Sequence, residues 1–84
     1  MQYLVEKRNY GCNNHGFYVS DELPIVESNT ISFKELRQLH KKHFRQYIRN
    51  EKDTFDILIQ QLPKYDGQIL GSTYFFNIKI ISNS

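Results

Sequence analysis

The spacing of hydrophobic and polar residues changes along the chain, and it predicts both helices and strands. From Ser32 to Lys52 apolar residues recur every third or fourth position, which is typical of a helix with one buried face. From Thr73 to Ile81 β-branched and aromatic residues dominate, which is the strongest strand pattern in the chain. The two patterns together predict a fold that mixes helix and sheet.

The helix predicted over Ser32–Lys52 has two faces of opposite character when its residues are projected at about 100° per position. The apolar face, expected to lie in the core, carries Phe33, Leu36, Leu39, His40, His43, Phe44, Tyr47 and Ile48. The polar face is almost uniformly basic, with Glu35 only at its margin. Its residues are the candidate binding residues Lys34, Gln38, Lys41, Lys42, Arg45, Arg49 and Lys52.

The start of this helical region carries two capping signals. Ser32 and Glu35 have the spacing of a capping box, and Ile31 with Leu36 has that of a hydrophobic staple. A weaker joint follows at 50–53, where Asp53 or Thr54 could cap a second helix. The apolar residues of that second helix would be Phe55, Leu58, Ile59 and Leu62, and Pro63 would end it. A single kinked helix over 33–62 remains an alternative.

Three further segments complete the expected fold. Residues 3–7 and 17–20 read as strands of an antiparallel hairpin around the turn cluster 9–16. Ile25–Val26 could add a short edge segment, and 66–67 marks a turn. The element order ββααβ predicts an α+β protein, a small single-layer antiparallel sheet with two helices packed on one face. The opposite face would carry Phe75 and Ile81, which is unusually apolar for a solvated surface.

Length and composition bound the possible functions. With 84 residues and one cysteine, the chain is expected to form a single domain, 1–84, without an internal disulfide. The single cysteine, Cys12, makes a cytoplasmic location the expectation, and no apolar run is long enough to predict a membrane span. The absence of alanine and the excess of Ile, Asn, Lys, Tyr and Phe are typical of an A/T-rich gene, which suggests a low-GC bacterium, a phage or a mobile element.

Charge is concentrated in one element. Residues 32–52 carry seven positive and two negative side chains, a net +5, and the rest of the chain nets −3, which together give the overall +2. A local patch of this kind steers association better than net charge does. We therefore expect a non-enzymatic binding protein. The small size and the A/T-rich usage favour an inhibitor of a host defence or regulatory complex. It would dock this basic face onto an acidic protein surface or a nucleoprotein complex, and direct binding of DNA or RNA is the alternative.

Other constellations are weaker. Cys12, His15, His40 and His43 have the spacing of two zinc half-sites, so a zinc-stabilised module is a second alternative, although no metal or cofactor is expected. No nucleophile, phosphate-binding or metalloprotease motif occurs, so catalysis is not expected. The apolar C-terminal strand could pair with a second copy to give a homodimer.

Overall fold

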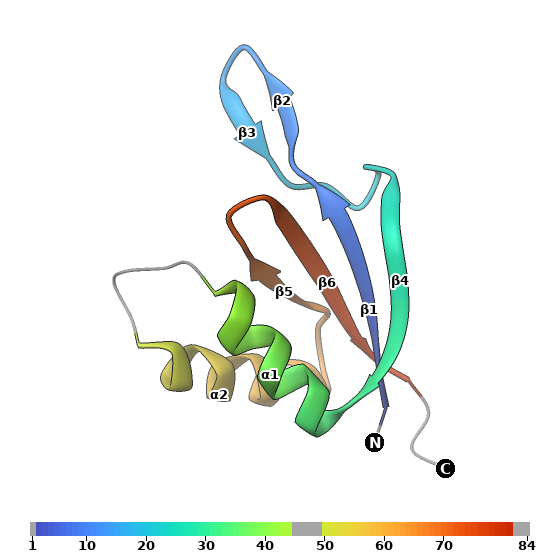
Figure 1. The fold of residues 1–84 in the computed structure, drawn as a ribbon, viewed down its shortest axis with the longest axis vertical. Coiled ribbons are helices and arrows are strands. Elements are labelled where there is room, and N and C mark those ends of the chain that lie inside the picture. The colour runs from blue at the N-terminus through green and yellow to red at the C-terminus, as the bar shows by residue number, and fades with distance from the viewer. Residues whose placement is uncertain (1, 45–49, 82–84) are drawn as a thin grey trace.

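The computed structural model describes residues 2–44 and 50–81, which form a four-stranded antiparallel sheet, a separate two-stranded hairpin and two helices (Figure 1). The elements in chain order are β1 (Gln2–Asn9), β2 (Gly11–Asn13), β3 (Gly16–Tyr18), β4 (Ile25–Ser32), α1 (Phe33–His43), α2 (Glu51–Gln61), β5 (Gly67–Leu70) and β6 (Tyr74–Ile80). The sheet order is β4-β1-β6-β5, with both helices on one face. The predicted α+β class is confirmed, although the chain contains more strands than the predicted order ββααβ.

The predicted pairing of the N-terminal strand is wrong. β1 pairs with β4 and with β6, and not with residues 17–20. Residues 11–18 instead fold back on themselves, because Asn13 Oδ1 accepts the His15 N–H at 2.8 Å and Gly16 adopts a φ of +111°. Much of the predicted turn cluster is therefore strand, and the hairpin stands beyond the end of the main sheet that is opposite the helices (Figure 1).

The two edge strands, β4 and β5, differ from the prediction: β4 is longer than expected and β5 was not expected. Ile25–Val26 extends into β4, a strand of eight residues that ends directly at the start of α1. β5 was not predicted, because it is short and its first residue, Gly67, reads as a turn residue. A Cβ at position 67 would lie 2.2 Å from Leu58 Cδ1, so glycine there lets α2 pack against β5. β6 lies between β1 and β5 and so has no free edge, and the homodimer predicted through this strand stays a prediction.

The predicted helix over Ser32–Lys52 does not run its full length. The capping box at Ser32 and Glu35 is present, which confirms the predicted start. α1 nevertheless ends at His43, because Phe44 has extended backbone angles of −65° and 131°. α2 begins at Glu51 with Asn50 as its N-cap, and it ends before Pro63 as expected. The alternative of one kinked helix and the predicted caps Asp53 and Thr54 are therefore wrong, and the predicted core residues Tyr47 and Ile48 lie outside the described residues.

The core lies between the helices and the inner face of the sheet. Alternate residues of β6 face it as predicted, because Phe76 and Ile78 are buried and Tyr74 and Ile80 pack at its margin. The buried cluster comprises Tyr3, Val5, Leu36, Phe55, Leu58, Leu62, Ile69, Phe76 and Ile78. Phe33, which was predicted to be buried, remains 48% exposed.

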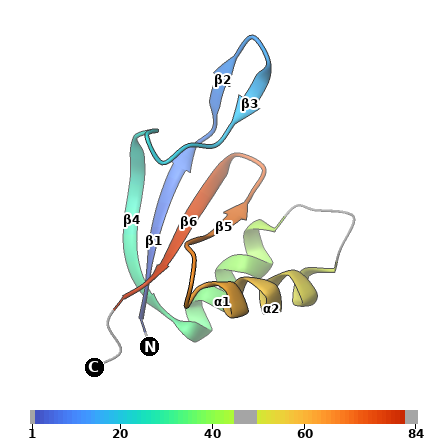
Figure 2. The ribbon, with the colours of Figure 1, turned by 180° about the vertical axis from the view of Figure 1, so that it is seen from behind.

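The outer face of the sheet is not a solvated surface. Phe75 is 0% exposed, and its ring packs against that of Tyr10 with centroids 5.4 Å apart. The segment between β3 and β4 crosses this face as it returns to the sheet edge (Figure 2). The unusual apolar character of the face therefore reflects a second, smaller buried layer.

Candidate interaction surface

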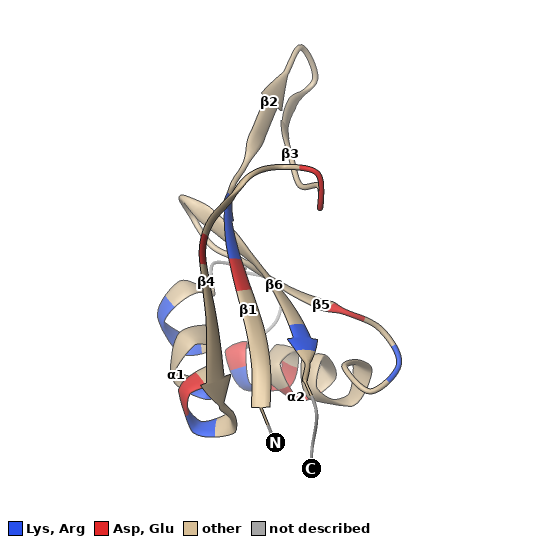
Figure 3. Cartoon of the chain, turned by 90° about the vertical axis from the view of Figure 1, so that its right-hand side faces the viewer, with Lys and Arg blue, Asp and Glu red and all other residues tan. Residues whose placement is uncertain are grey.

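The outer side of α1 presents lysines that pair with no acid in the described part of the chain. Lys34, Gln38, Lys41 and Lys42 are exposed on this helix. Figure 3 shows lysine and arginine positions, in blue, along α1. Among the residues that the structure describes, none of these lysines has a carboxylate within ion-pair distance. The acid on the same helix, Glu35, is held in the capping box, where its Oε1 accepts the Ser32 N–H at 3.2 Å. The described part of the predicted basic face therefore presents uncompensated positive charge.

The remaining predicted site residues do not extend this surface along one helix. Lys52 is exposed, but it lies on α2 and not on α1. Arg45 and Arg49 lie outside the described residues. Arg37, which was not among the candidates, forms an ion pair with Glu51. The break after His43 thus confines the described surface to Lys34, Gln38, Lys41 and Lys42, which we call the α1 basic face.

A groove of about 390 Å³ runs between α1 and the inner face of β1 and β4. Gln38 and Lys42 of the α1 basic face belong to its lining. Its apolar lining comes from Val5, Ile31, Leu39 and Phe76. Apolar surface bordered by polar groups is the usual composition of a peptide-binding or protein-binding cleft. The sequence did not reveal this groove, because it forms only where α1 fails to cover the β4 side of the sheet.

Most charges along the groove are already paired. Lys7 Nζ lies 3.8 Å from Glu27 and 4.1 Å from the centroid of the Tyr74 ring. The His43 ring packs against Phe76 with centroids 4.8 Å apart. Within the described residues, Lys42 is the lining cation that has no acidic partner. An anionic group entering the groove would find this ammonium group at its rim.

His40 has a structural role that fits its predicted place on the core face. The residue is 1% exposed, and its ring stacks on Phe44 and contacts the Phe55 ring edge-on. Nδ1 of His40 and the guanidinium of Arg37 both contact the Glu51 carboxylate. Burial alone would raise the pKa of Glu51, but these hydrogen bonds and positive charges outweigh burial and lower it. The cluster fixes the start of α2 against α1.

The predicted zinc set is not assembled. Cys12 and His15 lie on the β2–β3 hairpin, at the opposite end of the molecule from α1, which carries His40 and His43 (Figure 1). Across residues 2–44 and 50–81, no three His, Cys, Asp or Glu side chains gather as a metal site would require. These four residues therefore do not form the predicted zinc site in the described structure.

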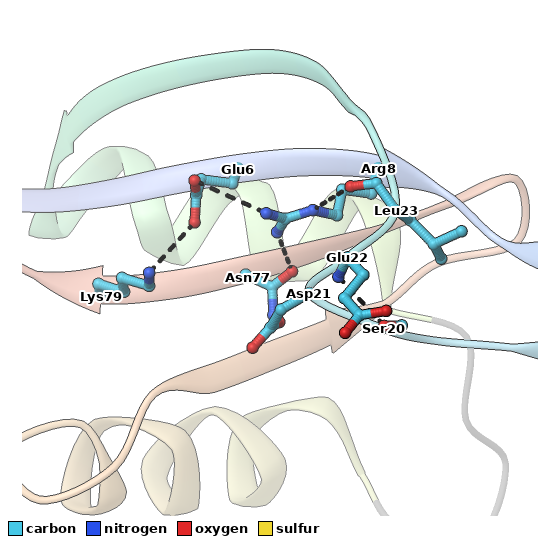
Figure 4. A network of polar contacts seen from close by, with 8 residues as sticks. All are labelled: Glu6, Arg8, Ser20, Asp21, Glu22, Leu23, Asn77 and Lys79. Carbon is cyan, nitrogen blue, oxygen red and sulfur yellow. Dashed lines mark hydrogen bonds and ion pairs between the residues drawn. The ribbon is translucent and has the colours of Figure 1, made fainter.

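A polar network on the outer face also resembles a site, but its groups are engaged with one another (Figure 4). Arg8 is 6% exposed, and it donates hydrogen bonds to the Asn77 side-chain oxygen and to the Leu23 carbonyl. Asn77 Nδ2 in turn donates to Asp21 at 3.0 Å. Glu6 lies 3.8 Å from Arg8 and 3.5 Å from Lys79. This network holds the segment between β3 and β4 across the sheet, and no pattern in the sequence pointed to it.

Comparisons with other proteins leave the function to be argued from this geometry. No family model, curated protein or solved structure matches the chain. Over the described residues, neither helix has the length and apolar character needed to cross a bilayer.

Proposed function

We propose that this chain is a small non-enzymatic binding protein. It binds the acidic surface of a partner protein through α1 and the groove beside this helix. The observation that carries the proposal is a combination of two features. The lysines of the α1 basic face have no acidic partner among the described residues, and the apolar groove beside them shares Gln38 and Lys42. The cations would attract and orient the partner, and burial of an apolar side chain in the groove would supply affinity.

An acidic protein is a better fit than nucleic acid. The described α1 basic face has Lys34, Lys41 and Lys42, which would neutralise few phosphates. α2 carries the exposed acids Asp53 and Asp56, which would repel an extended polyanion. A groove with apolar walls would not contribute to contacts with the sugar-phosphate backbone of a duplex. It can accept a leucine or phenylalanine side chain from a protein.

The proposed partner remains the acidic surface of a nucleic-acid-handling complex, and the proposed consequence of docking is inhibition of that complex. This part of the proposal comes from the composition of the chain and from its small size. A module of one small sheet and two helices can block a surface without performing chemistry on it.

Titration of isotope-labelled protein followed by NMR tests the proposal. One titration uses a peptide of glutamates around a central leucine, and the other uses duplex DNA. We expect the peptide to shift amide signals of Gln38, Lys42 and the groove residues Ile31 and Leu39. Shifts with DNA alone, weakening steeply with salt, would favour the nucleic-acid alternative. Unchanged spectra in both titrations would count against any anion-binding role.

Neutralising variants identify the cations involved. Lys41→Gln with Lys42→Gln should weaken peptide binding about fivefold to thirtyfold, because each lost charged contact is worth roughly 0.5 to 1 kcal/mol. Lys64→Gln is the matched control, because Lys64 is an exposed lysine that lies beyond α2. Equal weakening by both changes would show attraction to overall charge and not to the α1 basic face.

A further inference from the structure

β5 has one side that no strand covers. The sheet order places β6 on one side of β5, and no strand within residues 2–44 and 50–81 pairs with its other side. A trough of about 380 Å³ lies along this free edge, lined by all four β5 residues, Gly67, Gln68, Ile69 and Leu70. α1 and α2 contribute His40, Phe44, Thr54 and Gln61 to the same trough. The edge is therefore recessed beside the helices.

The pairing register shows which backbone groups face the trough. The Gly71 N–H donates to the Tyr74 carbonyl at 3.0 Å, so these two residues form a hydrogen-bonded pair. Hydrogen-bonded and non-hydrogen-bonded pairs alternate along an antiparallel ladder, so Ile69 also bonds to β6. The N–H and C=O groups of Gln68 and Leu70 consequently point outward, which is the arrangement that an added strand requires.

The trough is acidic. Asp21 and Asp66 line it, and across the described residues no lysine or arginine does. Asp21 accepts a hydrogen bond from Asn77 at 3.0 Å, and no described lysine or arginine lies within ion-pair distance of it. Asp66 is exposed, and the contact that holds this residue uses its backbone carbonyl, which accepts from Gln61. A strand placed here would meet negative charge on its flanks.

The opposite edge of the sheet is less suited to strand addition. β4 is longer, but the register of its pairing with β1 shifts next to Arg8, and Pro24 directly precedes it. Irregular pairing and proline are devices that blunt an edge. A second copy is also a poor occupant of the β5 trough, because two-fold pairing of β5 with itself would bring like charges at Asp21 and Asp66 together.

We propose that the β5 edge binds an extended, lysine-bearing or arginine-bearing segment of a partner protein by strand addition. The outward groups of Gln68 and Leu70 would bond to the backbone of the segment, and its basic side chains would approach Asp21 and Asp66. This edge is distinct from the groove beside α1, so the chain has two binding surfaces with opposite charge preference.

Selection from a random-peptide display library on immobilised protein tests the inference. We expect enriched peptides to carry Lys or Arg within alternating β-branched residues. Gln68→Pro should weaken their binding about tenfold, because it removes the outward N–H of an edge residue without removing a bond to β6. Gln68→Ala is the matched control, because it changes the side chain and keeps the N–H. Asp66→Asn should weaken binding by up to about fivefold.

A direct measurement on the unaltered protein guards against misfolding of the proline variant. The Gln68 and Leu70 amides should exchange rapidly in the free protein and become protected when a selected peptide binds. The inference is overturned if selection enriches no peptide. It is equally overturned by binders that Gln68→Pro leaves unaffected, or by a dimer of the wild-type protein that Gln68→Pro dissociates. Acidic binders that respond to Lys41 and Lys42 would support the proposed function while rejecting the edge site.

Discussion

Arg8 and Asn77, which are 69 positions apart in the chain, are joined by a buried hydrogen bond on the outer face of the sheet. The same guanidinium donates from Nε to the Leu23 carbonyl at 2.9 Å. One side chain therefore ties together β1, β6 and the segment that returns from the hairpin (Figure 4). The contact explains why a face that carries Phe75 is sealed from solvent.

Arg8→Met should destabilise the fold by about 3 kcal/mol, because it leaves the buried Asn77 oxygen and Leu23 carbonyl without their donor. The free energy of unfolding in urea measures the loss. Lys79→Met is the control, because Lys79 is more exposed and contacts only the margin of the network through Glu6 at 3.5 Å. It should cost less than about 1 kcal/mol, and equal losses would contradict the role given to Arg8.

The stability of the protein should fall in acid partly through Glu51. Its pKa is lower in the folded state than in the unfolded state, so its contribution to stability is full above the unfolded pKa. The contribution disappears as the pH falls through the folded pKa. In unfolding experiments from about pH 6 to about pH 3, Glu51→Gln should show a weaker acid dependence than the wild type.

Arg37→Gln tests the cause of this pKa shift, because it removes one of the two donors to the Glu51 carboxylate. Its acid dependence should lie between those of the wild type and Glu51→Gln. Parallel pH curves for all three proteins would show that Glu51 contributes nothing through its ionisation.

Truncation to alanine should destabilise the protein strongly at Phe75 and hardly at all at Phe17. Phe75 is 0% exposed and Phe17 is 81% exposed. Phe75→Ala should cost about 3 to 5 kcal/mol, because it opens a cavity beneath Tyr10. Phe17→Ala on the hairpin should change stability by less than about 0.5 kcal/mol. Thermal unfolding of the pair distinguishes a sealed outer face from an open one, and a small effect of Phe75→Ala would refute the seal.

Asn50 should be worth about 1 kcal/mol as the N-cap of α2. Its Oδ1 accepts the Asp53 N–H at 2.8 Å, and alanine cannot replace that bond. Asn50→Ala should therefore lower the midpoint of unfolding. Gln60→Ala in the same helix serves as the reference for placing alanine in α2. If the two variants unfold at the same midpoint, the start of α2 does not depend on this cap.

Features that depend on local spacing were predictable. The capping box at Ser32 and Glu35, the alternation along β6 and the helix end before Pro63 all depend on residues close in the chain. The break after His43 was missed, because the apolar period continues through 45–49 while Phe44 turns to extended geometry. The candidate site was predicted only in part, because the break separates Lys52 from the lysines of α1.

The sequence by itself determined which residues prefer helix or strand, where α1 begins, and that positive charge gathers in one region. These properties follow from interactions within a few positions of the chain. Only the tertiary structure decided that β1 lies between β4 and β6, that Arg8 meets Asn77, and that the β5 edge stays free. Strand partners are chosen by burial and hydrogen bonding between segments far apart in the chain, and single-sequence periodicity carries no record of that choice.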